Sequence, residues 1–321
     1  MDKSNANQGA DHEPNTPQKY DIIGDIHGHA DELIKLLECL EYQMSDTGYR
    51  HEDRKVIFLG DFIDRGEHLR QHKQLLDTVI PMVSNGHALA VMGNHEFNAL
   101  AFHTLHDGAY LRPHTDKNTS QHQAFLNEYE SDLELKQAVL DFFYTLPLWL
   151  ELDGLRVIHA CWDDKHVEHI KTVAPNKLLT EELLVEASTK DTDTYNAIET
   201  LLKGVEVELL DGVSFKDKDR HERTAVRVQW WKSDASSLGD MALPFGIDIG
   251  DAAHCDIPEI IPTYTEDQPP CFIGHYWLTG EPAPLTNNVA CLDYSVANGG
   301  KLVAYRWDGE AVLSKAKFMS P

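Results

Sequence analysis

Five short apolar runs of this chain each end in a residue type that binds metal ions. The residues that follow them are Asp25-Ile26-His27, Asp61, Asn94-His95, His159 and His275. Short apolar runs bounded by glycine are typical of buried strands, and the end of a buried strand can hold a side chain rigidly. Carboxylate, amide and imidazole groups gathered at such ends would suit two divalent metal ions, which activate water and clamp a phosphoryl group.

The second of these blocks crowds charge at the end of an apolar run. Asp61, Asp64 and Arg65 directly follow the run 56–59. Charged groups are costly to bury unless they are paired or bound to metal. The block Gly93-Asn94-His95-Glu96 repeats this placement after the next run. Three such blocks in order, followed by two isolated histidines at strand ends, predict a functional site rather than a set of ordinary turns.

Composition and charge limit the classes of function. The chain has 321 residues, of which 42% are hydrophobic and 25% charged, as in a soluble globular enzyme with a sizeable core. Its formal net charge is -25. Proteins that grip the nucleic-acid backbone need a basic surface, so no stable nucleic-acid binding is expected. Metal cations in a cleft would still attract an anionic substrate locally.

Cysteine usage and the distribution of apolar residues point to the cytoplasm. Five cysteines without a Cys-x-x-Cys pair predict reduced, mostly buried thiols rather than disulfides or structural zinc. Residues 1–18 are polar, lack the apolar segment of a secretory signal and are predicted to form a flexible tail. No apolar stretch approaches the roughly 20 residues needed to cross a bilayer. The sequence therefore predicts a cytoplasmic protein with no membrane association.

Strands and helices alternate in the first part of the chain. Strands are predicted at 20–23, 56–59 and 88–92, separated by two helices whose apolar residues share one face, the second helix being closed by Pro81. This alternation is the signature of an α/β domain. A mostly helical stretch is then expected to about Leu146, followed by a hairpin of 149–152 and 155–158 around Asp153-Gly154.

The second half of the chain gives weaker patterns. We expect a helix at 181–202, strands at 205–209 and 226–231, and short closing strands at 271–273, 290–293 and 302–307. No repeat or sharp linker divides the chain. One domain is therefore predicted over 19–321, with an insertion at about 163–262.

The motifs resemble a known family. Three blocks are similar to the fingerprint of the calcineurin-like metallophosphoesterases: Asp25-x-His27-Gly28, Gly60-Asp61-x-x-Asp64-Arg65-Gly66 and Gly93-Asn94-His95-Glu96. More narrowly, they resemble the phosphoprotein phosphatase branch, which also holds symmetrical diadenosine tetraphosphatases. The resemblance implies an α/β fold in which a β-sandwich of mixed sheets is flanked by helices, with helical insertions.

The resemblance implies metal ligands at the matching positions. The first metal would be held by Asp25, His27 and Asp61, and the second by Asp61, Asn94, His159 and His275. The two metals would share a hydroxide that attacks phosphorus directly. A ligand set of oxygen and nitrogen without thiolate suits manganese, with iron, zinc or cobalt as alternatives.

It also implies catalytic roles in the second and third blocks. Arg65 would bind phosphate oxygens through its planar guanidinium, which a lysine could not imitate. His95 would protonate the leaving oxygen, and Asp64 would orient its imidazole.

Contacts with the substrate outside the motifs stay open. A second phosphate-binding arginine is expected in the middle region, where Arg223 and Arg227 precede Trp230-Trp231. Tyr276 could line the cleft, although a packing role is equally compatible with its place after a strand.

A histidine-rich stretch follows the third block. It contains His103, His106, His114 and His122. These histidines lack the paired helical spacing of a metal site, so we expect a solvated helical insertion rather than a further metal site.

Three functions fit this pattern. The first is a metal-dependent phosphomonoesterase of the phosphoprotein phosphatase type, acting on phosphoproteins or small phosphoesters. The alternative is a dinucleoside polyphosphate hydrolase, such as a diadenosine tetraphosphate hydrolase, which needs the same metals and a pocket for a base. The third is a non-catalytic phosphate-binding scaffold. Retention of every proposed ligand and of the His95–Asp64 pair favours the two enzymes. No oligomeric state is predicted.

Overall fold

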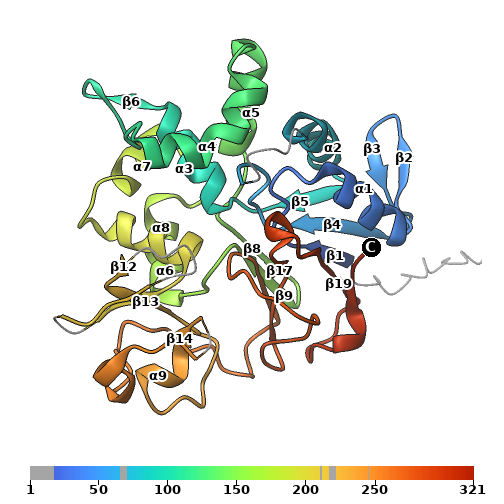
Figure 1. The fold of residues 1–321 in the computed structure, drawn as a ribbon. Coiled ribbons are helices and arrows are strands. Elements are labelled where there is room, and N and C mark those ends of the chain that lie inside the picture. The colour runs from blue at the N-terminus through green and yellow to red at the C-terminus, as the bar shows by residue number, and fades with distance from the viewer. Residues whose placement is uncertain (1–17, 66–70, 210–211, 217–221, 245) are drawn as a thin grey trace, which may run out of the picture.

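In the computed structural model, two mixed β-sheets form the centre of the fold (Figure 1). The structure describes residues 18–65, 71–209, 212–216, 222–244 and 246–321, so the predicted tail lies outside the described residues apart from Gln18. The five-stranded sheet has the order β20-β19-β1-β4-β5, and the four-stranded sheet has the order β16-β15-β9-β8.

Each of these sheets combines parallel and antiparallel pairs. The strands of the first are β1 (Lys19–Ile23), β4 (Arg54–Phe58), β5 (Ala88–Ala90), β19 (Ala304–Trp307) and β20 (Phe318–Met319). In it, β1, β4 and β5 are parallel, while β19 runs antiparallel to both β1 and β20. The strands of the second are β8 (Trp149–Leu152), β9 (Leu155–Ile158), β15 (Cys271–Ile273) and β16 (Val289–Cys291). There β9, β15 and β16 are parallel, and β8 pairs antiparallel with β9.

The two sheets pack face to face. Side chains alternate between the faces of a strand, so Ile22 and Ile57 point one way and their neighbours the other. Ile22 and Ile57 join Val157 and Phe272 of the four-stranded sheet in one buried cluster. The opposite face packs, through residues such as Phe58, against helices α1 (Ala30–Cys39) and α2 (His72–Ser84). The expected β-sandwich of mixed sheets flanked by helices is confirmed.

Helix α2 continues past the residue that was expected to close it. Pro81 lies inside the helix, which ends at Ser84. Proline at this position removes one hydrogen bond of the helix, the one that residue 81 would donate to the Asp77 carbonyl oxygen. Burial of Val79 and Met82 on the core face favours continuation. A hairpin of β2 (Gln43–Ser45) and β3 (Gly48–Arg50) also lies between the first two predicted strands.

The segment after the third motif is mostly helical, as predicted. It contains α3 (Asn94–His103), α4 (Asp116–Tyr129) and α5 (Leu133–Tyr144). Between α3 and α4 stands a short hairpin of β6 (Leu105–His106) and β7 (Ala109–Tyr110). Its turn residues Asp107 and Gly108 both have positive φ, the conformation that suits a two-residue hairpin loop.

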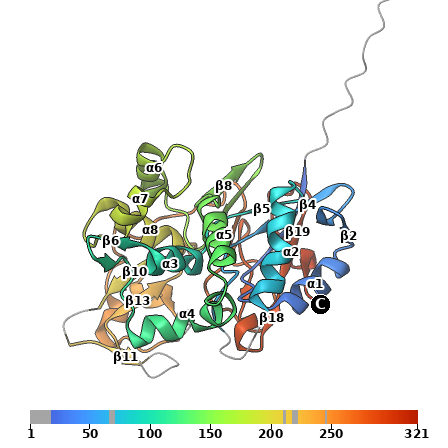
Figure 2. The ribbon, with the colours of Figure 1, turned by 90° about the horizontal axis from the view of Figure 1, so that it is seen from above.

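The middle of the chain forms a group of short elements. These are α6 (Asp164–Val173), α7 (Glu181–Ala187), α8 (Asp193–Lys203), β10 (Glu206–Glu208), β11 (Phe215–Lys216), β12 (Glu222–Arg223), β13 (Ala225–Val228), α9 (Leu238–Met241), β14 (Ala242–Leu243) and the 3-10 turn η1 (Gly250–His254). In both views α6 and α8 lie on the opposite side of the molecule from α1 and α2 (Figures 1 and 2).

The helix predicted at 181–202 is two helices. Thr192 begins the second one by accepting a hydrogen bond at its hydroxyl from the Tyr195 N–H, at 3.0 Å. A threonine cap of this kind satisfies a helix donor only where a new helix starts. The prediction of a single helix across this cap was wrong.

Short elements close the chain. They are β17 (Asp293–Tyr294), η2 (Val296–Asn298), β18 (Lys301–Leu302) and η3 (Lys315–Lys317), in addition to the strands of the first sheet. The strand predicted at 302–307 is divided at Val303, because β18 pairs with β17 whereas β19 pairs with β1. All five cysteines are free, as predicted. None of the described helices is long and apolar enough to span a bilayer.

Candidate metal centre

Loops from both sheets meet at one buried cluster of ligand-type side chains. Asp25 and His27 follow β1, Asp61 follows β4, His159 follows β9 and His275 follows β15. These strands are parallel to their neighbours within each sheet, so their carboxyl ends lie at the same edge. Every one of the five side chains is buried.

Asp61 occupies the middle of the cluster. Its Oδ2 lies 3.7 Å from His27 Nε2, 3.4 Å from His159 Nε2 and 4.0 Å from His95 Nε2. The ligand atoms form two groups that share Asp61, each with all atoms within 4.8 Å of one another: His27, Asp61 and His95 in one, and Asp61, His159 and His275 in the other. A carboxylate shared by two ligand groups is the arrangement expected of a residue that bridges two cations.

Asn94 supplies an amide oxygen to the second group. Its Oδ1 lies 3.1 Å from His159 Nε2 and 2.7 Å from His275 Nδ1. Asn94 is the first residue of α3, so its position is fixed by the start of that helix. The structure thus brings together the four residues that the sequence assigned to the second metal.

Backbone carbonyls select the tautomer of two of these histidines. His27 Nδ1 lies 2.9 Å from the Ile63 carbonyl oxygen, and His159 Nδ1 lies 2.7 Å from the Leu59 carbonyl oxygen. Because a carbonyl only accepts, each ring donates through Nδ1 and turns Nε2 toward Asp61. Metal-binding histidines are oriented in this way.

Three buried polar atoms of the cluster have no hydrogen-bond partner among the described residues. They are Asp25 Oδ1, His27 Nε2 and His275 Nε2. Buried polar groups are almost always paired, so unpaired atoms at one place call for an explanation. Oxygen and imidazole nitrogen donors suit divalent first-row ions. The residues fit two such ions.

The electrostatics of the cluster agree with cation binding. Burial lowers the pKa of His27 to about 3 and that of His275 well below its ordinary value, so both rings are neutral at pH 7. Burial and the neighbouring Asp293 raise the pKa of Asp25 well above its ordinary value. Burial opposes protonation of His159, but Asp61 outweighs it and raises the pKa of His159 to about 10. A bound cation would stabilise the ionised form of a buried carboxyl group whose pKa is raised in this way.

Glycine permits the close approach of two of the loops. A Cβ on Gly274 would lie 2.0 Å from Asp25 Oδ1, and a Cβ on Gly93 would lie 2.3 Å from Asp61 Oδ1. Any side chain at either position would push a carboxylate out of the cluster. The glycines that bound the motifs are therefore required by packing at the site.

Asp25 lies at the border of the first ligand group rather than within it. Its Oδ2 accepts a hydrogen bond from the His275 backbone N–H at 3.0 Å. The group that the geometry gathers around His27 and Asp61 includes His95 in place of Asp25. We retain Asp25 as a proposed ligand because its Oδ1 is buried and unpaired.

His95 is positioned to serve the same centre from its other side. Its Nδ1 lies 2.9 Å from Asp64 Oδ2, and its backbone N–H donates to Asp61 Oδ1 at 3.0 Å. Asp64 holds the ring so that Nε2 faces Asp61. The sequence placed these two residues together, and the structure places them in hydrogen-bond contact.

Arg65 is exposed to solvent. Its guanidinium carbon lies 4.2 Å from the ring centroid of Trp277, a cation–π contact. Asp61, Asp64 and Asp293 lie within its electrostatic reach. An arginine that is held over an indole and left open to solvent can present both donors of its fork to a phosphate group.

The two middle arginines are placed differently. Arg223, on β12, is exposed. Arg227, on β13, donates to Glu206 at 3.0 Å, its Nε is buried without a partner among the described residues, and its charge helps to lower the pKa of the buried His275. Arg227 is therefore the better placed of the two for an anionic group at the metal centre.

Tyr276 faces the middle region. Its hydroxyl accepts a hydrogen bond from Trp230 Nε1 at 3.0 Å, and its ring packs edge-on against Trp231. The side chain is buried. We assign Tyr276 a packing role that fixes the loop carrying His275.

Two buried carboxylates support the site and were not assigned roles from the sequence. Glu96 accepts hydrogen bonds from the backbone N–H groups of Asp61, Phe62 and Gly93 at 2.8, 2.9 and 3.0 Å, and so ties together the loops after β4 and β5. Asp293 accepts from the Trp277 N–H at 2.7 Å. Glu96 belongs to a motif that the sequence shows, whereas nothing near Asp293 in the sequence marks it.

His122 departs from the expected solvated insertion. It is 4% exposed and its Nδ1 lies 2.9 Å from Asp64 Oδ1. The prediction of a solvated side chain is wrong here because α4 packs against the loop after β4. His103 contacts His122, His114 is stacked on Phe102, and His106 is exposed in the β6–β7 hairpin.

The comparison with known families agrees with this geometry. The profile described as calcineurin-like phosphoesterase matches residues 19–240, more than half of the chain. The chain belongs to the calcineurin-like phosphoesterase family. The match begins at β1 and includes the motif residues of the first four blocks.

Curated relatives and a solved structure share parts of the chain. The asymmetrical bis(5'-nucleosyl)-tetraphosphatase PrpE of Oceanobacillus iheyensis is 30% identical over 144 residues, 44% of this chain and 55% of that protein. Its counterpart from Anoxybacillus flavithermus is 44% identical over 77 residues, 24% of this chain and 30% of that protein. The chain thus spans about half the length, or less, of these relatives. A protein serine/threonine phosphatase from Saccharomyces cerevisiae with similarity to human phosphatase PP5 has a TM-score of 0.50 at 14% identity, covering 96% of this chain and 80% of that one, which shows a shared fold.

Proposed function

We propose that this protein is a cytoplasmic two-metal phosphohydrolase that cleaves bis(5'-nucleosyl) polyphosphates, with manganese as the first candidate metal. The observation that carries the reaction class is the buried Asp61 carboxylate shared by two ligand groups. The substrate class is supported by the curated relatives, which are named as bis(5'-nucleosyl)-tetraphosphatases.

Two divalent ions in this centre would activate the attacking water and neutralise charge on the phosphoryl group. Asp25, His27 and Asp61 would hold one ion, while Asp61, Asn94, His159 and His275 would hold the other. Arg65 would bind phosphate oxygens at the solvent side of the centre, and Arg227 would do so from β13.

His95 provides the acid of the reaction. With its Nδ1 committed to Asp64, the proton to be transferred resides on Nε2, which faces the metal cluster. A general acid of this kind contributes typically 10²–10⁴-fold to a rate. The size of this rate contribution depends on the leaving group, because an alkoxide must be protonated as it leaves whereas a more acidic leaving group need not be.

That dependence supports phosphomonoester hydrolysis as the second candidate function. The alkoxide of a phosphoserine is a poor leaving group. A nucleoside phosphate has a second pKa of about 6 and can leave without protonation. The buried His95–Asp64 pair is thus more useful to a phosphomonoesterase than to an anhydride hydrolase.

The experiment compares the two substrates on one preparation. Chelator-stripped protein is assayed with and without manganese on diadenosine tetraphosphate and on a phosphoserine peptide, and kcat/KM and the nucleotide products are determined. We expect metal-dependent hydrolysis with the higher kcat/KM on the dinucleotide. The products distinguish asymmetrical cleavage, to ATP and AMP, from symmetrical cleavage to two ADP.

Variants assign the activity to the centre. Asp61→Asn should lose both metal and turnover, whereas Asp77→Asn, on the exposed side of α2, should keep both. His95→Ala should keep its metal and lose about 10²-fold on the phosphopeptide, with a smaller loss on the dinucleotide. A higher kcat/KM on the phosphopeptide would favour the second function. Absence of hydrolysis of both substrates by metal-loaded protein would favour the scaffold.

A further inference from the structure

The Asp64 carboxylate contacts two imidazoles, one on each oxygen. Its Oδ2 lies 2.9 Å from His95 Nδ1, and its Oδ1 lies 2.9 Å from Nδ1 of His122 on α4. Although burial opposes ionisation, His122 and His95 hold the pKa of Asp64 well below its ordinary value. An ionised carboxylate only accepts hydrogen bonds, so both rings donate through Nδ1.

The His122 ring contacts three further side chains. Its Nε2 lies 3.1 Å from His103 Nε2, and its ring stacks on Phe125 with centroids 4.8 Å apart and planes at 18°. Phe102 contacts the ring at 5.0 Å. Burial lowers the pKa of His103 to about 3, so that ring is neutral. The result is a buried row that runs from His95 through Asp64 and His122 to His103.

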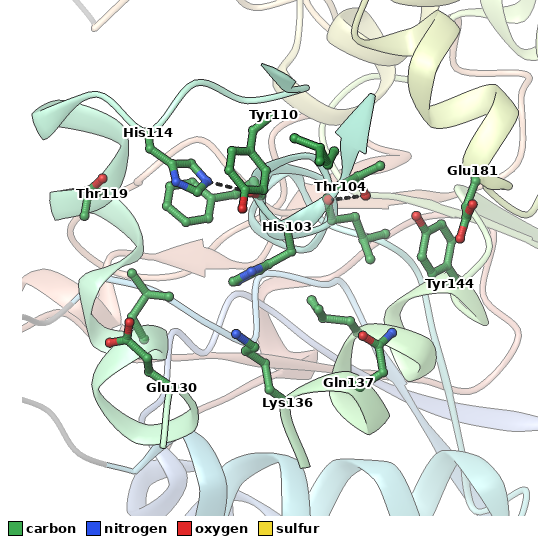
Figure 3. A pocket seen from close by; sticks show the side chains of 15 residues that line it. His103, Thr104, Tyr110, His114, Thr119, Glu130, Lys136, Gln137, Tyr144 and Glu181 are labelled. Carbon is green, nitrogen blue, oxygen red and sulfur yellow. Dashed lines mark hydrogen bonds between the residues drawn. The ribbon is translucent and has the colours of Figure 1, made fainter. Parts of the chain in front are cut away.

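The row ends at a pocket. His103 is the last residue of α3 and lines a cavity of about 700 Å³ together with Tyr110, His114 and Lys136. In Figure 3 its ring points into this cavity above Lys136. The other members of the row, His95, Asp64 and His122, line a separate small pocket.

The backbone of Asp64 is held in an uncommon conformation. Its φ is +66°, in the left-handed region that a non-glycine residue occupies only when its surroundings hold it there. With one donor, the carboxylate could turn about its Cβ–Cγ bond and leave the second oxygen buried without a partner, which is costly. A second donor on the opposite oxygen fixes the plane of the carboxylate.

We propose that His122 is a positioning residue for the leaving-group acid: it clamps Asp64 so that the other carboxylate oxygen aims His95 Nε2 at the reacting centre. His103 supports this role by occupying Nε2 of His122. The inference rests on the proposed phosphohydrolase function and extends its acid from two residues to three.

The experiment varies the leaving group. His122→Phe keeps the ring and its stacking on Phe125 but removes the donor to Asp64. His122→Asn restores a donor near the position of Nδ1. Metal-loaded wild-type and variant proteins are assayed on phenyl phosphate, p-nitrophenyl phosphate and 2,4-dinitrophenyl phosphate, with metal content measured for each.

We expect His122→Phe to lower kcat about 10-fold on phenyl phosphate, whose leaving group needs a proton, and by less than about 2-fold on 2,4-dinitrophenyl phosphate. KM and metal content should stay unchanged. His122→Asn should recover most of the loss. The matched control is His114→Gln: this histidine belongs to the same aromatic cluster, but its Nε2 donates to the Phe102 carbonyl oxygen at 2.8 Å. That variant should keep the wild-type dependence on the leaving group.

Each other outcome overturns the inference. An equal loss on all three substrates would make His122 a structural residue only, and an unchanged profile would show that Asp64 needs no second donor. If the metal-loaded wild-type protein hydrolysed neither aryl phosphates nor dinucleotides, the proposed function itself would fail, and with it the reaction that His122 is inferred to serve.

Discussion

Replacement of Gly274 by alanine tests whether the metal centre depends on the close approach of its two sheets. The new Cβ would lie 2.0 Å from Asp25 Oδ1, whereas real Cβ contacts are essentially never under 3.0 Å. The strand end cannot retreat easily, because the Gly274 N–H donates to the His159 carbonyl oxygen at 2.8 Å. The Asp25 carboxylate must therefore move by about 1 Å or more, whereas the ligands of a metal site keep their distances to within about 0.2 Å.

We expect Gly274→Ala to bind one ion fewer per chain than wild type and to lose metal-dependent turnover. Metal content is measured by mass spectrometry after gel filtration of the folded monomer or oligomer, and stability is measured by urea unfolding. Gly86→Ala is the control. Gly86 has a φ of +73° and no atom within 4 Å of its added Cβ, so the change should destabilise the fold by about 1 kcal/mol without loss of metal.

The two variants separate a damaged fold from a damaged site. If Gly274→Ala retained two ions per chain and wild-type turnover, Asp25 could not be a ligand in the arrangement described above. A loss of metal in both variants in proportion to their stability would likewise refute the steric argument, since Gly86 does not approach the centre.

Two further predictions concern the charged network at the other end of β1. Arg54→Leu should lower the free energy of unfolding in urea by about 3 kcal/mol, because buried Asp21 loses the Arg54 Nε donor at 2.9 Å and retains the Tyr42 hydroxyl at 3.0 Å and Arg306 at 3.4 Å. A loss under about 1 kcal/mol would contradict this. Partial burial opposes ionisation of Asp308, but hydrogen bonds from Lys317 and Arg54 lower its pKa to about 2. A carboxyl group whose pKa is lowered by folding stabilises the fold at pH values above its unfolded pKa of about 4, and this contribution is lost as the pH falls toward 2. The difference in unfolding free energy between wild type and Asp308→Asn should therefore shrink between pH 5 and pH 3. Because Asp308 is partly exposed, the change should be less than about 1 kcal/mol.

The proposed metal ligands could be singled out from the sequence because each one follows a short apolar run. The strand dictates the local geometry, and the glycines next to Asp25, Asp61 and Asn94 mark the tight turns that the site requires. Parallel pairing then brings the strand ends together without any further information. The alternation of strands and helices indicated an α/β domain, whereas the two-sheet architecture was implied by the family resemblance.

The side chains that contact Asp64 and Arg65 from outside the motifs could not be predicted in this way. His122 reaches Asp64 across 58 positions, from a helix whose sequence shows no motif. The sequence does not indicate a role for Trp277, although it follows His275 by two residues, because its contact with Arg65 depends on a left-handed backbone at both residues. The break between α7 and α8 depends on a threonine cap that helical periodicity does not reveal.

The hydrogen bond between the His275 N–H and Asp25 joins two positions 250 residues apart. Chains fold from the N-terminus as they are synthesised, and β1 can pair with β4 early. The centre nevertheless lacks the proposed ligand His275 until β15 has left the ribosome, and β1 lacks one neighbour until β19 follows. If His275 is a metal ligand as proposed, the centre would be completed late in biosynthesis, and a nascent chain would not become active before β15 has been made.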